Sequence, residues 1–185
     1  MDRLAGAGRR TTVNSMDEER DAIDVTPLGD PNPDDVAAFW ARYLRTAGSV
    51  PSPSVPPAWC FGDTVELADE LIELVVRGPK RATVAAVAEY EADGDPMPAV
   101  GDLSIATDGS MRPRALLETT EVRVGPLSSV DERFAWDEGE GDRTREWWLD
   151  AHTRYFTRAF AAMGLEFHPD VAVVFERFAV RYHED

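Results

Sequence analysis

Apolar residues recur at helical spacing in the first half of the chain and predict an amphipathic helix. Asn32 supplies a capping side chain, Pro33 fits the first helical position, and acidic residues follow in the first turn. Gly48 ends the apolar stripe. The stripe consists of Val36, Phe39, Trp40, Tyr43, Leu44 and Ala47. Residues 49–57 contain four prolines, so an extended loop is predicted after this helix.

A second amphipathic helix is predicted from about Asp63, where Glu66 completes a capping box. Gly78 is expected to cap its C-terminal end. The apolar face consists of Val65, Ala68, Leu71, Ile72 and Val75. Lys80 and Thr83 therefore lie just past a helix end, in a turn that enters the next element, which is a suitable place for function.

The pattern then changes from helical spacing to alternation. Gly101-Asp102 opens a strand at 103–107, Asp108-Gly109 is a turn, and residues 112–124 form a longer strand, so that a β-hairpin results. The chain closes with a β-rich apolar run at 171–180 that suits a buried strand.

Two further helices are predicted between the hairpin and the last strand. Ser129 and Asp131 precede a short helix, and residues 138–142 form an acidic, glycine-rich loop. A longer helix follows and stops at Gly164. Its stripe consists of Trp148, Ala151, Tyr155, Ala159 and Met163. The order of elements predicts an α+β fold in which the strands form a small β-barrel with surrounding helices.

The length of 185 residues, with 43% hydrophobic content, suits one globular core. Residues 1–30 are polar and lack periodic apolar content, so they are predicted to be a disordered tail whose removal leaves the thermal stability nearly unchanged. Met16 is an alternative start of translation. Residues 31–185 are then a single domain whose first helix is an N-terminal extension.

The formal net charge of -16 disfavours a broad grip on a long polyanion, because such binding neutralises many phosphates with Lys and Arg. A local basic pocket would instead hold a short or small ligand more readily than a long polyanion, unless the acidic residues lie on the opposite face. No apolar run has the length of a membrane span, and no secretory signal precedes the domain. With Cys60 as the single cysteine, the sequence predicts a cytoplasmic protein without membrane association.

Lys80 is the only lysine among 19 basic residues, and the other 18 are arginines. One interpretation is coding bias that left a single lysine by chance. The other is that position 80 needs a property that a guanidinium group lacks, such as loss of a proton or a compact charge. The second interpretation is favoured by the position of Lys80 just past a helix end.

The segment Gly78-x-Lys80-x-Ala82-Thr83 resembles the signature of the ASCH family, and the resemblance extends over roughly residues 59–182. Pro79 departs from it, because a basic or polar residue is usual there. Further similar segments are Val100-Gly101-Asp102, Leu117-Glu118-Thr119-Thr120-Glu121-Val122, Phe134-Ala135 before the acidic loop, Trp148 with His152 and Phe156, and Glu176-Arg177-Phe178.

The resemblance implies a PUA-like fold, a β-barrel with helices around it, and a function related to RNA. One branch of the family is an amidohydrolase of N4-acetylcytidine that uses a Thr, Lys and Glu set, and another branch includes a ribonuclease. Carried over by position, the implied catalytic residues are Lys80, Thr83 and Glu138. Glu140 is the alternative to Glu138, because the acidic loop can also be aligned with the family pattern after a shift of two residues. Arg81, Glu140 and Trp147 are the expected ligand-binding residues.

A threonine hydroxyl needs a neighbouring base to become a nucleophile, and a lysine with a depressed pKa can serve. The expected reaction is attack by Thr83 on an amide carbonyl, with Lys80 as base and Glu138 as acid/base. No metal or other cofactor is expected. Two alternatives stay open: a metal-dependent ribonuclease with a basic channel that includes Arg77, Arg81, Arg112 and Arg114, and a binding module without catalysis. The oligomeric state is not predicted.

The remaining candidates have simpler explanations. His152, His168 and His183 lack the spacing of a structural metal site, and His152 is expected to be a satisfied histidine at the core edge. Trp136, Trp147 and Tyr90 could each stack on a base. Trp147 is of most interest among them, because it lies off the apolar stripe of its helix.

Overall fold

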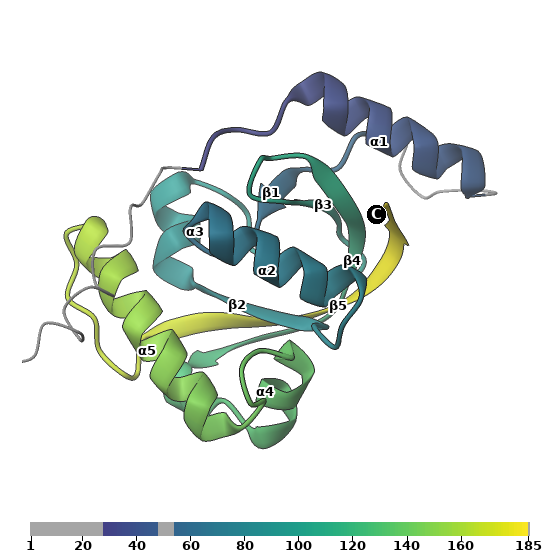
Figure 1. Ribbon diagram of the computed structural model, residues 1–185. Helices are drawn as coiled ribbons and strands as arrows, with labels where there is room; N and C mark the ends of the chain where they lie inside the picture. The colour runs from purple at the N-terminus through teal and green to yellow at the C-terminus, as the bar shows by residue number, and fades with distance from the viewer. Residues whose placement is uncertain (1–27, 48–53, 185) are drawn as a thin grey trace, which may run out of the picture.

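The computed structural model describes residues 28–47 and 54–184 (Figure 1). The predicted tail therefore lies almost wholly outside the described residues, as does part of the loop predicted at 49–57. The elements in chain order are α1 (Pro33–Thr46), β1 (Ala58–Cys60), α2 (Val65–Val76), β2 (Ala82–Ala86), α3 (Val87–Asp93), β3 (Leu103–Thr107), β4 (Pro113–Pro126), the 3-10 helix η1 (Leu127–Ser129), α4 (Glu132–Glu138), α5 (Arg145–Ala162) and β5 (Ala172–His183).

The predicted start of α1 is confirmed, while that of α2 was wrong by a residue. Asn32 caps α1, since its Oδ1 accepts from Asp34 N at 2.9 Å. In α2 the cap is Thr64 rather than Asp63, and Thr64 Oγ1 accepts from Leu67 N at 3.2 Å. The carboxylate of Asp63 instead pairs with Arg158 at 3.0 Å. A long-range ion pair thus removes Asp63 from the capping role.

The strands form one five-stranded sheet in the order β1-β3-β4-β5-β2. The predicted hairpin is confirmed as the antiparallel pair β3–β4, and the predicted last strand is β5, which lies between β4 and β2. Strands β1 and β2 are the edges and do not pair with each other within the described residues. The α+β class is confirmed, but the sheet is open where a closed barrel was expected.

The two faces of the sheet are buried by different helices. In Figure 1, α4 and α5 lie below the β2–β5 pair and α2 lies above it. Phe175 of β5 packs with Phe134 and Trp148 of the lower helices. Phe178, which lies on the other face because strand residues alternate, packs with the α2 cluster. Helix α1 covers a third cluster near β3 and β4. No helix among the described residues is long and apolar enough to cross a membrane.

Candidate functional site

Lys80 is buried between the end of α2 and the start of β2. Its backbone N donates to Leu74 O at 3.1 Å, which ties the residue to the last turn of the helix. The side chain is only 1% exposed; its Nζ donates to Glu140 Oε1 and lies 5.2 Å from the centre of the Phe61 ring. A buried ammonium group requires a charged partner, and Glu140 supplies it. The only lysine of the chain is thus a buried, paired group rather than a surface charge.

The loop after α4 is clamped against the segment that carries Lys80. Arg81 N donates to Asp137 O at 2.7 Å. Gly139 has a φ of +76°, and a Cβ built on it would lie 2.8 Å from Lys80 N and 2.9 Å from Pro79 Cγ. Only glycine allows this combination of left-handed backbone and close approach. The glycine in the acidic loop therefore sets the distance between that loop and Lys80.

Replacing Gly139 by alanine is expected to lower the free energy of unfolding by about 2 kcal/mol, because the strained φ and the steric overlap add. Gly94→Ala is the matched control. Gly94 has a φ of +73° but nothing within 4 Å of a built Cβ, so only the conformational cost of about 1 kcal/mol applies. Urea denaturation measures both. Equal losses in the two variants would contradict the close packing of Gly139 on Lys80.

Glu138 is buried beside Lys80 and is held by two residues of α5. Its Oε2 accepts from Trp148 Nε1 and lies 3.4 Å from His152 Nε2. Burial alone would raise the pKa of Glu138, but the charges of His152 and Lys80 and the hydrogen bonds from α5 outweigh it, so this pKa is lowered. Glu138 is therefore ionised in the folded protein at neutral pH.

His152 faces Glu138 with a defined tautomer. Its Nδ1 lies 2.9 Å from the carbonyl oxygen of Trp148, and because a carbonyl only accepts, Nδ1 carries a hydrogen. The ring stacks on Trp148 at a centroid distance of 3.8 Å. Burial lowers the pKa of His152. The charge and hydrogen bond of Glu138 and the charge of Glu140 raise this pKa by more, so the net shift is upward. The raised pKa favours the imidazolium form of His152 beside the Glu138 carboxylate.

Thr83 lies on β2, with its side chain on the face opposite to that of its neighbours Ala82 and Val84, which pack with the α5 cluster. Its direct partner across the sheet is Glu176 of β5. The Thr83 hydroxyl has no hydrogen-bond partner within the part of the chain that the structure describes, and the residue is half-buried. The structure therefore places Lys80, Glu138 and Glu140 together, while Thr83 stands three residues further along with a free hydroxyl.

The expected ligand-binding residues Arg81 and Trp147 both make internal contacts. Arg81 Nη1 donates to Val75 O at 3.0 Å and to Lys80 O at 2.5 Å, so this guanidinium holds the backbone around Lys80. Trp147 packs so closely on Gly141 that a built Cβ would lie 2.1 Å from the ring. Trp147 also lines a cavity of about 280 Å³ with Asp142, Thr144, Glu146 and Asp150.

The other aromatic and basic candidates are separate from this site. Trp136 is 56% exposed and is covered by the guanidinium of Arg143 at 3.6 Å. Arg112 pairs with Asp108 at 2.9 Å and Arg114 pairs with Glu73 at 2.7 Å. Both guanidinium groups are thus paired with carboxylates of the fold. Among residues 28–47 and 54–184, no group of three or more His, Cys, Asp or Glu side chains is placed to hold a metal ion.

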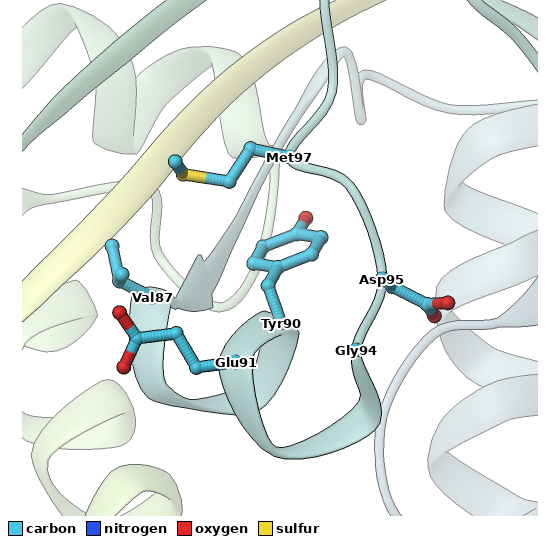
Figure 2. A pocket seen from close by; sticks show the side chains of 6 residues that line it. All are labelled: Val87, Tyr90, Glu91, Gly94, Asp95 and Met97. Carbon is cyan, nitrogen blue, oxygen red and sulfur yellow. The ribbon is translucent and has the colours of Figure 1, made fainter.

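Tyr90 lines a second cavity of about 280 Å³, under α3. Figure 2 shows the Tyr90 ring rising from the helix towards Met97, with Val87 and Asp95 on either side. Burial and then the charge of Glu176 raise the pKa of Tyr90 to about 12. The phenol is therefore neutral and lies within electrostatic reach of Glu176.

The sequence did not predict the contact of His152 with Glu138 or the position of Glu176 opposite Thr83. His152 does lie at the core edge, as expected, but it is also the ionic partner of Glu138. Glu176 interrupts an apolar strand, and a charged residue there is costly to bury without a partner. That interruption was the available signal for Glu176, whereas the pairing of His152 with Glu138 depends on how α4 and α5 pack.

Comparison with known proteins identifies the family. The sequence matches the family model of the ASCH domain over residues 57–182. An ASCH domain from Lactobacillus crispatus JV V101 is 32% identical, with a TM-score of 0.72 over 81% of this chain and 96% of that one. Protein EF3133 from Enterococcus faecalis V583 is 30% identical, with a TM-score of 0.73 over 82% of this chain and 98% of that one. A search among curated proteins found no significant match. The chain belongs to the ASCH domain family.

Proposed function

We propose that this protein hydrolyses the amide bond of a modified nucleoside of the N4-acylcytidine type, with Thr83 as nucleophile and Lys80 as its base. The observation that carries the proposal is the setting of Lys80. The only lysine of the chain is 1% exposed, its ammonium group contacts Glu140, and it lies three residues before an unbonded threonine hydroxyl. A solvated surface lysine would have no such enclosure.

The Lys80–Glu140 contact supplies a route for the lysine proton. Transfer of a proton from Nζ to the Glu140 carboxylate leaves a neutral amine, which can accept the Thr83 hydroxyl proton as Oγ attacks a carbonyl. Arginine does not release a proton at physiological pH. This accounts for a lysine at position 80 in a chain whose other 18 Lys-or-Arg positions are all arginine.

Glu138 is proposed to orient Lys80 rather than to reach the substrate. Its carboxylate is 1% exposed and is enclosed by Trp148 and His152. Its lowered pKa keeps Glu138 negative, so its carboxylate attracts the charged side chain of Lys80 and holds it in position. The two carboxylates of the loop then have different tasks: Glu140 exchanges a proton and Glu138 holds position.

The proposed ligand is a small nucleoside, nucleotide or short RNA end in the cytoplasm. The net charge of -16 opposes long polyanions, and Arg112 and Arg114 are paired with carboxylates. No membrane partner is proposed. We also propose that the fold is related to the PUA-like barrels, although the five-stranded sheet is open.

The deciding experiment compares release of cytidine from N4-acetylcytidine with cleavage of a long single-stranded RNA, with and without a divalent cation and at several salt concentrations. Turnover of the nucleoside without added metal is expected. Metal-dependent cutting of the RNA with no nucleoside turnover would instead establish a ribonuclease. Saturable nucleoside binding without any turnover would establish a binding module.

Lys80→Arg is expected to lower kcat for the acylated nucleoside about 100-fold, because the positive charge is retained but the base is lost. Arg133→Lys, on an 85% exposed side chain of α4, is the control for an exchange between the two basic residues and should leave kcat unchanged. Circular dichroism establishes that both variants are folded. A fully active Lys80→Arg protein would favour coding chance as the reason for a single lysine.

A further inference from the structure

Glu176 shares one face of the sheet with Thr83. The two residues are direct partners in the antiparallel pair β2–β5, where side chains of opposed residues point the same way with Cβ atoms about 5 Å apart. Phe178, two residues on in β5, lies on that face as well and packs with Phe61, over whose ring Lys80 Nζ lies. Thr83 and Glu176 therefore share one face of the sheet, and the contact between Phe61 and Phe178 connects that face to Lys80.

The Glu176 carboxylate is half-buried and has no cationic partner among the described residues. Its Oε1 accepts from Thr119 Oγ1 at 2.6 Å. The neighbouring Arg177 points to the other face, where it pairs with Glu121 at 2.9 Å and with Asp137 at 3.0 Å. Burial raises the pKa of Glu176; the Thr119 hydrogen bond opposes this, and the charge of Asp102 adds to it. Such a carboxyl group can carry a proton at a pH where an exposed glutamate is ionised.

Tyr90, which lines a cavity beside α3, lies within electrostatic reach of this carboxylate. The space of about 280 Å³ under α3 has Tyr90 as an aromatic wall, with Val87 and Met97 close by (Figure 2). Helix α3 directly continues β2, the strand that carries Thr83, and it contacts β5, the strand that carries Glu176. An aromatic wall beside a carboxyl group suits a flat heterocyclic base with an exocyclic amine.

We infer that Glu176 is a catalytic residue: the general acid that protonates the leaving amine of the substrate, whose base stacks on Tyr90 in the cavity under α3. The inference rests on the proposed function and gives Glu176 the acid role that the sequence assigned to Glu138. It follows from the contrast between the two carboxylates. Glu138 is enclosed by Trp148 and His152, whereas Glu176 keeps one oxygen free of any partner that the structure describes and faces the nucleophile.

The proposed steps balance in protons and bonds. Thr83 Oγ forms a bond to the acyl carbon as its proton moves to the Lys80 amine, and the carbon–nitrogen bond breaks as the Glu176 proton moves to the departing nitrogen. Water then attacks the acyl-threonine and gives its proton to the Glu176 carboxylate. The ester bond breaks, and the Lys80 ammonium returns a proton to Thr83 Oγ. The products are the free amine and the carboxylic acid, and Thr83, Lys80 and Glu176 all regain their starting state.

The test compares two substrates in Glu176→Gln: N4-acetylcytidine, whose nitrogen needs a proton to leave, and 4-nitrophenyl acetate, whose phenolate leaves without one. The amide side chain of glutamine preserves an acceptor for Thr119. Loss of a general acid should lower kcat for the amide about 100-fold and leave the ester rate within about threefold of wild type. Glu121→Gln, a 57% exposed carboxylate on the adjacent strand, removes the same charge and should change neither rate.

Each other outcome is decisive. Equal losses on both substrates would show that Glu176 supports the fold or the binding step and would overturn the acid role. An unchanged amide rate would overturn it as well, and a loss restricted to the amide in Glu138→Gln would return the role to Glu138. Wild-type protein that turns over neither substrate would overturn the proposed function together with the inference. Wild-type turnover with an unaffected Glu176→Gln variant would overturn the inference alone.

Discussion

Thr83→Ala is expected to lower kcat for N4-acetylcytidine by about 10⁴-fold or more, the largest effect of any single substitution, because no other group replaces a missing nucleophile. Binding should persist, since the Thr83 hydroxyl has no partner among the described residues and its loss leaves no buried group unsatisfied. Release of cytidine followed by chromatography measures the rate, and isothermal titration with the nucleoside measures binding.

Thr83→Ser supplies the matched control for this prediction. It keeps a hydroxyl at the same position and removes a methyl group, so a rate within about tenfold of wild type is expected if the oxygen is the nucleophile. Residual activity of Thr83→Ala above a tenth of wild type would show that a water molecule, and not Thr83, attacks the carbonyl. Lys80 would then be the base for water.

His152→Phe is expected to have the largest effect on stability, a loss of about 3 kcal/mol near pH 6, because it leaves the buried Glu138 carboxylate without its imidazolium partner. Phenylalanine retains a ring that can stack on Trp148, so the loss is mainly electrostatic. Thermal and urea denaturation of the two proteins at a series of pH values measure the difference.

The pH dependence of that loss follows from the direction of the two pKa shifts. Glu138 has a lowered pKa, so its contribution is present above the ordinary glutamate pKa of about 4.3 and is lost as the pH falls through the lowered value. His152 has a raised pKa, so its contribution is complete below about 6.5 and is lost as the pH rises through the raised value. The difference between wild type and His152→Phe should therefore be greatest between about pH 4.5 and 6.5.

His168→Phe is the control, because this histidine is 72% exposed and its Nδ1 lies 4.0 Å from the carboxylate of Asp170. Its substitution should change stability by less than about 0.5 kcal/mol at every pH. A His152→Phe profile parallel to that of wild type would mean that Glu138 is stabilised by Lys80 and Trp148 without the histidine.

Local signals explain why much of the fold could be predicted. The Asn32 cap, the turn at Asp108-Gly109 and the Gly164 stop each act within a few residues, and each lies where the sequence indicated. The position of Lys80 past the end of α2 was predicted by the same kind of signal. Its burial was not, because Glu140 and Phe61 reach it from distant parts of the chain.

The features that could not be predicted depend on register and packing. Strand β1 is three residues long and pairs in parallel with β3, so its own sequence carries almost no periodic signal. Strand β2 and helix α3 follow each other without a break at Ala86, and no turn residue marks the boundary. The pairing of Thr83 with Glu176 is fixed only when β2 adds to β5, across more than half the length of the chain.

The hydrogen bond from Arg81 N to Asp137 O also affects whether the sheet edge can pair with a second molecule of the protein. Strand β2 is an edge of the sheet, and unpaired N–H groups on an edge attract strands of other molecules. The N–H groups at its two ends are taken, that of Arg81 by Asp137 O at 2.7 Å and that of Ala86 by Glu89 Oε2 at 2.6 Å. These two N–H groups are therefore not available to a strand of another molecule, so the segment that carries Lys80 also limits strand addition at this edge.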